Sequence, residues 1–186
     1  IYGGSSKYDD NMLELDKVLN RFAKHVVTQS KANLTRGGKK VSSKLYDSIT
    51  SELNASKNSF SLSFEMEDYG EFQDQGVKGA NPNLVKGGIQ KAPNAPFSFK
   101  NKRPPSKFIS EWAKAKNIRL RDEKGRYTRG NYDTIGIILA KRIFAQGIKP
   151  SLFFTKPFES AFKNLPDELV EAFDLDLDNL LKFTTK

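Results

Sequence analysis

The 186-residue sequence has no cysteine and only one histidine, His25. Without cysteine, the chain cannot form a disulfide, and no thiolate can serve as a nucleophile or metal ligand. A single histidine excludes a multi-histidine metal site within one chain, and a Ser-His-Asp triad would have to include His25. His25 lies beside an apolar stripe at helical spacing, where a histidine is usually a packed or surface residue.

Long apolar runs are also missing. The longest, IGIILA at 135–140 and LFF at 152–154, are far too short to cross a bilayer, which takes about 20 residues. The sequence contains no phosphate-binding loop, nucleophile elbow or zinc motif. We therefore expect no membrane partner, no cofactor, no metal site and no catalytic residues, so that the protein is not an enzyme.

Two groups of carboxylates are the remaining candidates for chemistry. The first is Glu65, Glu67, Asp68 and Asp74, which would suit a metal-dependent hydrolase. The second, DLDLD at 174–178, suggests calcium but lacks the glycine and the ligand spacing of an EF-hand loop. Alternation along a strand explains the first group, and the apolar stripe of a helix explains the second, so we interpret both as structural.

Charge is distributed unevenly along the chain, whose formal net charge is +9. Residues 86–149 contain 16 Lys and Arg and four Asp and Glu, a net charge of +12. Residues 159–178 contain seven Asp and Glu and one Lys, a net charge of −6. The two segments can attract each other within one subunit or between neighbours. Alternatively, the basic segment, with its interleaved aromatic residues, makes the protein a nucleic-acid-binding module.

Hydrophobic periodicity predicts an α+β protein: a small antiparallel sheet packed with several helices. Apolar residues recur at helical spacing over 10–34, and a short second helix is expected over 41–53. SFSLSFEM at 59–66 alternates strictly and is the clearest strand, with 85–90, 97–100 or a neighbouring subunit as its partner. It runs into a polar turn that ends at Gly76.

The second half of the sequence combines a long loop with further helices. Residues 77–105 are rich in proline and glycine, and helices are predicted over 106–118 and 131–147. The last helix should bury a stripe of apolar residues: Leu169, Val170, Phe173, Leu177, Leu180 and Leu181. We expect a single domain over 1–186, with an N-terminal arm at 1–9 and an inserted loop-helix region at about 77–149.

Three motifs, in this order, resemble the tail-completion and neck proteins of tailed bacteriophages, the head–tail joining family. The motifs are SSKLYDSI after the first helix, DYGEFQDQGVKG at the end of the strand, and GIKPSLFFTKPFESAF before the final helix. The matching positions are Leu45, Ser48 and Ile49; Tyr69, Gly70, Gln73 and Gly76, with Phe72 between them; and Pro150, Phe153, Pro157 and Ala161. The sequence departs from the family pattern in FQDQG and in the segment at 80–146, which separates the second motif from the third and is longer than in compact members of the family.

The resemblance implies a structural virion protein without enzymatic activity. It would form a homo-oligomeric ring, a hexamer or dodecamer, in the virion neck or upper tail after assembly in the host cytoplasm. Its partners would be portal or connector proteins, tail proteins and, transiently, phage DNA in the ring lumen.

The residues expected to contact a neighbouring subunit or partner lie in the turn, the long loop and the charged segment 119–130. They are Tyr69, Phe72, Gly76, Lys86, Phe97, Phe99, Arg103, Arg126, Tyr127 and Arg129. The expected structural landmarks are Leu45, Ile49, Pro150, Phe153 and Pro157.

Overall fold

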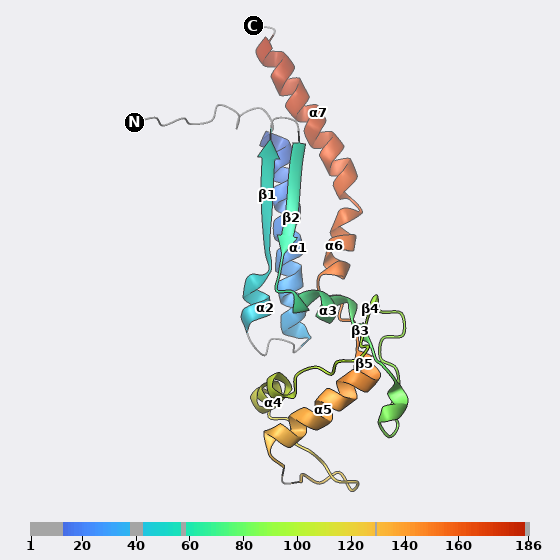
Figure 1. Ribbon diagram of the computed structural model, residues 1–186. Helices are drawn as coiled ribbons and strands as arrows, with labels where there is room; N and C mark the ends of the chain where they lie inside the picture. The colour runs from blue at the N-terminus through green and yellow to red at the C-terminus, as the bar shows by residue number, and fades with distance from the viewer. Residues whose placement is uncertain (1–12, 38–42, 57–58, 129, 185–186) are drawn as a thin grey trace, which may run out of the picture. The chain divides into compact units, whose positions relative to one another are not determined.

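The computed structural model describes residues 13–37, 43–56, 59–128 and 130–184 and shows an α+β protein (Figure 1). The described chain divides into two compact units. The first comprises the described residues of 1–36, 44–67 and 153–186, and the second those of 37–43 and 68–152. The predicted arm at 1–9 lies outside the described residues. Whether 1–186 folds as a single domain stays a prediction.

The first unit is built around one long helix, α1, which contacts a β-hairpin and two C-terminal helices. Its elements are α1 (Leu13–Arg36), α2 (Ser43–Ser48), β1 (Thr50–Ser56), β2 (Ser59–Glu65), α6 (Thr155–Phe162) and α7 (Leu165–Thr184). The helix predicted over 10–34 is confirmed from Leu13 onward by α1, and the alternation predicted over 59–66 is confirmed by β2.

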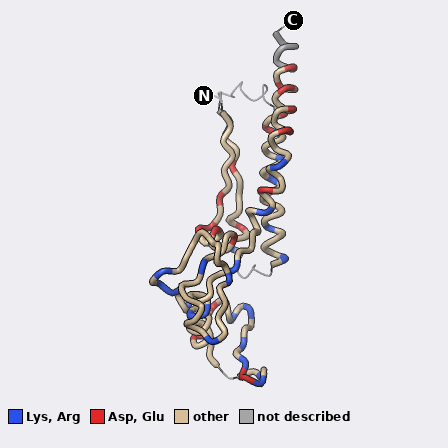
Figure 2. The backbone as a smooth tube through the Cα atoms, turned by 90° about the vertical axis from the view of Figure 1, so that its right-hand side faces the viewer, with Lys and Arg blue, Asp and Glu red and all other residues tan. Residues whose placement is uncertain are grey.

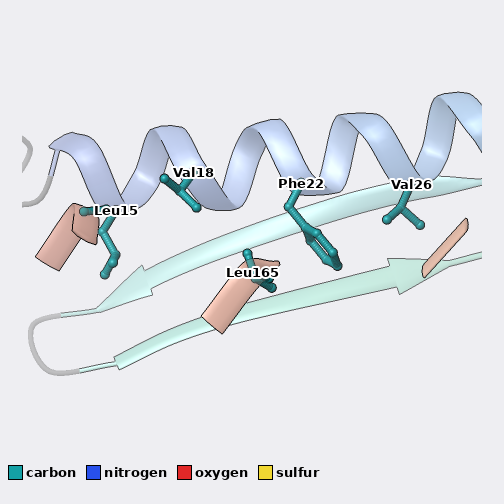
Figure 3. Packing of buried hydrophobic residues seen from close by; sticks show 6 residues of the cluster. Leu15, Val18, Phe22, Val26 and Leu165 are labelled. Atoms are coloured by element: carbon teal, nitrogen blue, oxygen red, sulfur yellow. The ribbon is translucent and has the colours of Figure 1, made fainter. Parts of the chain in front are cut away.

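Side chains from α1, α7 and β2 form the main core of this unit. Leu15, Val18, Phe22 and Val26 follow one face of α1 and lie over the hairpin, with Leu165 beside them (Figure 3). Phe22 and Phe64 of β2 meet edge to face with ring centroids 6.2 Å apart. Burying each large apolar side chain contributes about 1.5–3 kcal/mol, so this cluster holds helix, hairpin and α7 together.

The second predicted helix is only partly correct. It ends at Ser48, and residues 50–56, expected to continue it, form β1 instead. β1 is the partner of β2: the two strands are antiparallel, with Leu53 opposite Leu62. Neither 85–90 nor 97–100 pairs with β2 in the structure, so that expectation was wrong. The strand forms here because cross-strand pairing overrides the weak local preference of TSELNAS.

The second unit combines short strands with three helices. Its elements are α3 (Tyr69–Gln75), β3 (Val77–Lys78), a 3₁₀ turn η1 (Pro82–Leu84), β4 (Phe97–Ser98), α4 (Ser106–Ala115), α5 (Tyr132–Gln146) and β5 (Gly147–Ile148). The strand order is β4-β3-β5, with β3 parallel to β4 and antiparallel to β5. The two predicted helices are confirmed as α4 and α5, whereas the expected turn after β2 is in fact helix α3.

Glycines let backbone segments of the second unit approach closely. A Cβ at Gly136 of α5 would lie 2.6 Å from the carbonyl oxygen of Ser106 in α4. A Cβ at Gly79 would lie 2.2 Å from the carbonyl oxygen of Ala145. No side chain fits at such distances, so these two positions require glycine for α4 to pack on α5 and for the β3 segment to lie against the end of α5.

Candidate interaction surfaces

Of the first group of carboxylates, only Glu65 lies on β2, whereas Asp68 precedes α3 and Asp74 is buried within it, so alternation along a strand does not explain the whole group. Within the described ranges, no three His, Asp or Glu side chains are grouped so that they could hold a metal ion. Asp176, in the DLDLD segment, is buried, and its two oxygens accept hydrogen bonds of 3.1 Å from the backbone amides of Glu14 and Leu15. These amides belong to the first turn of α1, where helix N–H groups lack partners within the helix. Asp176 therefore caps α1 across the fold.

The three motifs join distant parts of the chain. In the first unit, Leu45 and Ile49 are buried in one cluster with Leu34 and Phe153. The hydroxyl of Ser48 donates to the Leu45 carbonyl and accepts a 3.0 Å hydrogen bond from the Glu67 amide. The first motif is thus tied to the end of β2 as well as to the third motif.

In the second unit, the second motif meets the start of the third. The Ser151 hydroxyl donates to the Gln73 carbonyl at 2.6 Å, and the Leu152 amide donates to the Asp74 carbonyl at 2.9 Å. Gly76 has φ +80°, and a Cβ there would lie 2.9 Å from the ring of Pro150. Pro157, in α6 of the first unit, is buried.

Five of the predicted contact residues are aromatic and lie in the second unit, four of them outside the charged segment 119–130. Tyr69 and Phe72 are exposed on α3, and the ring of Phe72 meets that of Phe97 edge to face at 4.7 Å. The ring centroids of Phe99 and Phe144 are 5.9 Å apart. The guanidinium carbon of Arg103 lies over the Phe144 ring, 5.8 Å from its centroid. Phe72 and Phe97 thus pack together, and Phe99 packs inside the unit.

The charged segment after α4 is a basic turn with one exposed tyrosine. Arg121 pairs with Tyr127 as a β-bridge, lies 4.4 Å from the centre of its ring and donates to its hydroxyl at 2.8 Å. Arg119 lies over the same ring at 5.7 Å. Arg126 forms a 3.2 Å ion pair with Asp122. Lys86 is exposed, and Arg129 lies outside the described residues.

The last helix buries only part of the face predicted for it. α7 turns Leu165, Ala172 and Asp176 inward, while Val170, Phe173 and Leu177 are exposed. The expectation was therefore wrong for those three residues, whereas Leu169 of the same predicted stripe packs against the core. The side chains of Leu180 and Leu181 lie outside the described part of the helix.

The exposed face of α7 carries acids beside its apolar residues. Asp167, Glu171, Asp174 and Asp178 recur at helical spacing on one side of the helix and are all exposed. Figure 2 shows Asp and Glu repeated along this helix. Sequence periodicity identified the apolar stripe but not its exposure, which follows from the orientation that Asp176 gives the helix.

A second exposed apolar face belongs to α4. Ser110 and Ala113 are buried toward α5, while Phe108 and Trp112, one turn apart, are exposed. Lys107 and Lys114 are exposed on the same helix, and exposed Lys116 follows its last residue. The signal that could have found this face is the pair of aromatic residues on the side of α4 away from Ala113.

Neither protein-family models, nor curated protein sequences, nor solved structures give a match to this chain. Among the described helices, none is both long enough and apolar enough to cross a membrane.

Proposed function

We propose that the protein is a structural virion protein of a tailed phage that forms a homo-oligomeric ring at the head–tail junction, where it connects portal to tail and lets DNA pass. One observation supports this most. Exposed Asp and Glu side chains recur along α7 of the first unit, whereas Lys and Arg predominate in the second unit, and both regions include large exposed apolar side chains. Copies with two different complementary surfaces associate head to tail, and such association closes into a ring when the rotation allows it.

The positions of the three motifs also support the proposal. Leu45, Ile49 and Phe153 share one buried cluster, and Gly76 lies against Pro150 in the second unit. Residues that make contacts between distant segments are constrained by the fold itself. The order of motifs on which the resemblance rests is therefore tied to the architecture rather than to local composition.

The direct test is the composition of particles. We expect this chain in purified virions in multiple copies per particle, and we expect an amber mutation in its gene to leave filled heads and separate tails. Quantitative mass spectrometry of the virions and electron microscopy of the mutant lysate measure the two outcomes. Absence of the chain from purified particles would contradict the proposed function.

The basic turn favours a second candidate function, a nucleic-acid-binding module. Arg119 and Arg121 flank the exposed ring of Tyr127, and exposed Lys124 lies in the same turn. Aromatic rings with flanking cations suit stacking on bases and contact with phosphates. If binding were the function, DNA affinity would fall steeply with salt and would fall further in the Tyr127→Ala variant. No retention on DNA at low salt would rule it out.

A further inference from the structure

We propose that the exposed face of α7 in one copy binds the exposed face of α4 in the next copy, and that this contact links the subunits head to tail. The inference rests on the proposed ring for its repeated geometry. It assigns the two surfaces that meet, which the proposed function leaves open.

The α7 face has the composition of an interface rather than of a solvated helix. Val170 is 63% exposed, Phe173 49% and Leu177 42%. They are spaced i, i+3 and i+7, so they form one stripe on the same side of the helix. Single exposed apolar residues are ordinary, but an aligned stripe of three with an aromatic residue in the middle marks an interaction surface.

The α4 face has the complementary composition. Phe108 is 67% exposed and Trp112 41%, at i and i+4 on the side opposite the buried Ala113. Tryptophan and other aromatic residues are enriched at the centres of protein interfaces, where they fill pockets on the partner. Lys107 and Lys114 share one flank of the helix with Glu111, the one acid of α4, and exposed Lys116 follows the last turn.

Charge complementarity identifies the occupant of each face. The apolar stripe of α7 is bordered by Asp167, Glu171, Asp174 and Asp178, and the aromatic pair of α4 by lysines. An acidic rim facing a basic rim steers association and disfavours the two like-charged pairings, α7 with α7 and α4 with α4. The contact is therefore between unlike surfaces, as head-to-tail assembly requires.

Contacts along α1 show where the α7 face lies within the first unit. Asp176 caps α1 at Glu14 and Leu15, whereas Phe153, where the chain returns from the second unit, packs with Leu34 at the other end of α1. At 1.5 Å per residue, about 29 Å of helix separates residues 15 and 34. The α7 face thus lies along the N-terminal half of α1, between the Arg21–Glu168 ion pair and the Asp176 cap.

A charge exchange between copies tests the contact. Variant A carries Asp174→Lys and Asp178→Lys on α7; variant B carries Lys107→Glu and Lys114→Glu on α4. In A alone, lysines face lysines, and in B alone, carboxylates face carboxylates. In an equimolar mixture, α7 of A meets α4 of B and α7 of B meets α4 of A, so every contact in an alternating assembly again joins opposite charges.

Sedimentation velocity over a concentration series at low salt measures self-association. We expect the wild type to associate, A and B each to associate at least roughly tenfold more weakly, and the mixture to return to within about threefold of the wild type. The matched control for A is Asp47→Lys with Glu52→Lys, exposed acids of the first unit away from α7. The control for B is Lys141→Glu with Arg142→Glu on α5, and both controls should associate as the wild type does.

Three results would overturn the inference: a wild type that stays monomeric throughout the series, variants that associate unchanged, or a mixture that is no stronger than its components. The proposed function is judged separately by the virions. If the chain is present in virions but its association does not respond to the charge exchange, the proposed function stands and the α7–α4 contact is rejected. If association responds to the charge exchange as expected but the chain is absent from virions, the α7–α4 contact stands and the proposed function is rejected.

Discussion

The two units of this chain differ in their internal packing. In the first unit, long elements bury side chains against one another, as Phe22, Phe64 and Phe158 do around α1. In the second, much of the packing is against the backbone of glycines: Gly136 lies on α4, and the Gln90 side chain bonds both the amide and the carbonyl of Gly79. The first unit should therefore respond most to loss of side-chain volume, and the second to its addition.

The largest effect is expected from Phe153→Ala. Phe153 is buried in the cluster of Leu34, Leu45 and Ile49, and removing a buried phenylalanine costs about 3–5 kcal/mol. The free energy of unfolding, followed by circular dichroism in urea, should fall by that amount. The matched control is Phe162→Ala on the exposed side of α6, which should change it by less than about 1 kcal/mol. Equal losses in the two variants would contradict the account.

Gly136→Ala should have the next largest effect, and in the second unit. Its new Cβ would meet the Ser106 carbonyl and Ser110, so α4 and α5 must separate, at a cost of about 1–3 kcal/mol. Trp112 is the only tryptophan and lies on α4, so its fluorescence reports on this unit alone.

The control for that substitution is Gly130→Ala. A Cβ there meets only the end of the Leu120 side chain, at 3.3 Å, which can move aside. The Trp112 transition should keep its midpoint in Gly130→Ala and move to lower urea in Gly136→Ala. A transition unmoved in both would show that close backbone approach does not hold α4 on α5.

Asp176→Ala should produce a smaller loss, about 1–2 kcal/mol, because the amides of Glu14 and Leu15 lose the cap of α1. Asp174→Ala, two residues earlier and exposed, is its matched control and should change stability little. Hydrogen exchange of the first turn of α1 is the local readout. Faster exchange there in Asp176→Ala only is expected, whereas equal exchange in both variants would remove the capping role.

The smallest expected change in the free energy of unfolding is that of Ser30→Ala, which is compared with Ser48→Ala in the same unit. The Ser30 hydroxyl is buried, with no hydrogen-bond partner among the described residues, whereas the Ser48 hydroxyl both donates and accepts. Ser30→Ala should leave the free energy of unfolding unchanged or slightly higher, and Ser48→Ala should lower it by about 1–2 kcal/mol. Urea denaturation of the two variants measures the difference, and a larger loss in Ser30→Ala would contradict it.

The sequence predicted best where a single element's own pattern decides the structure. The stripe of α1 and the alternation of β2 are local, and both predictions are confirmed. β1 was missed because TSELNAS becomes a strand only through its pairing with β2. Residues 69–76 were predicted as a turn because their glycine and polar residues resemble a loop, whereas the structure has helix α3 there.

The candidate surfaces show the same limit more sharply. Periodicity placed Val170, Phe173 and Leu177 on one face of the last helix but could not tell a core face from an exposed one. That choice is made by Asp176, whose hydrogen bonds to α1 turn the helix so that a carboxylate points inward and three apolar residues outward. A tertiary cap of this kind leaves no periodic signal in the sequence.

Cross-linking between two distinguishable copies tests most directly the claim that unlike surfaces join the subunits. The chain has no cysteine, so Val170→Cys in one tagged copy and Phe108→Cys in another each supply a single thiol. After mixing and treatment with a short bis-maleimide, we predict that the product joining the two different copies predominates over both products joining identical copies. Identical-copy products as abundant as the mixed one, or no product above that of a Ser61→Cys control, would contradict the account.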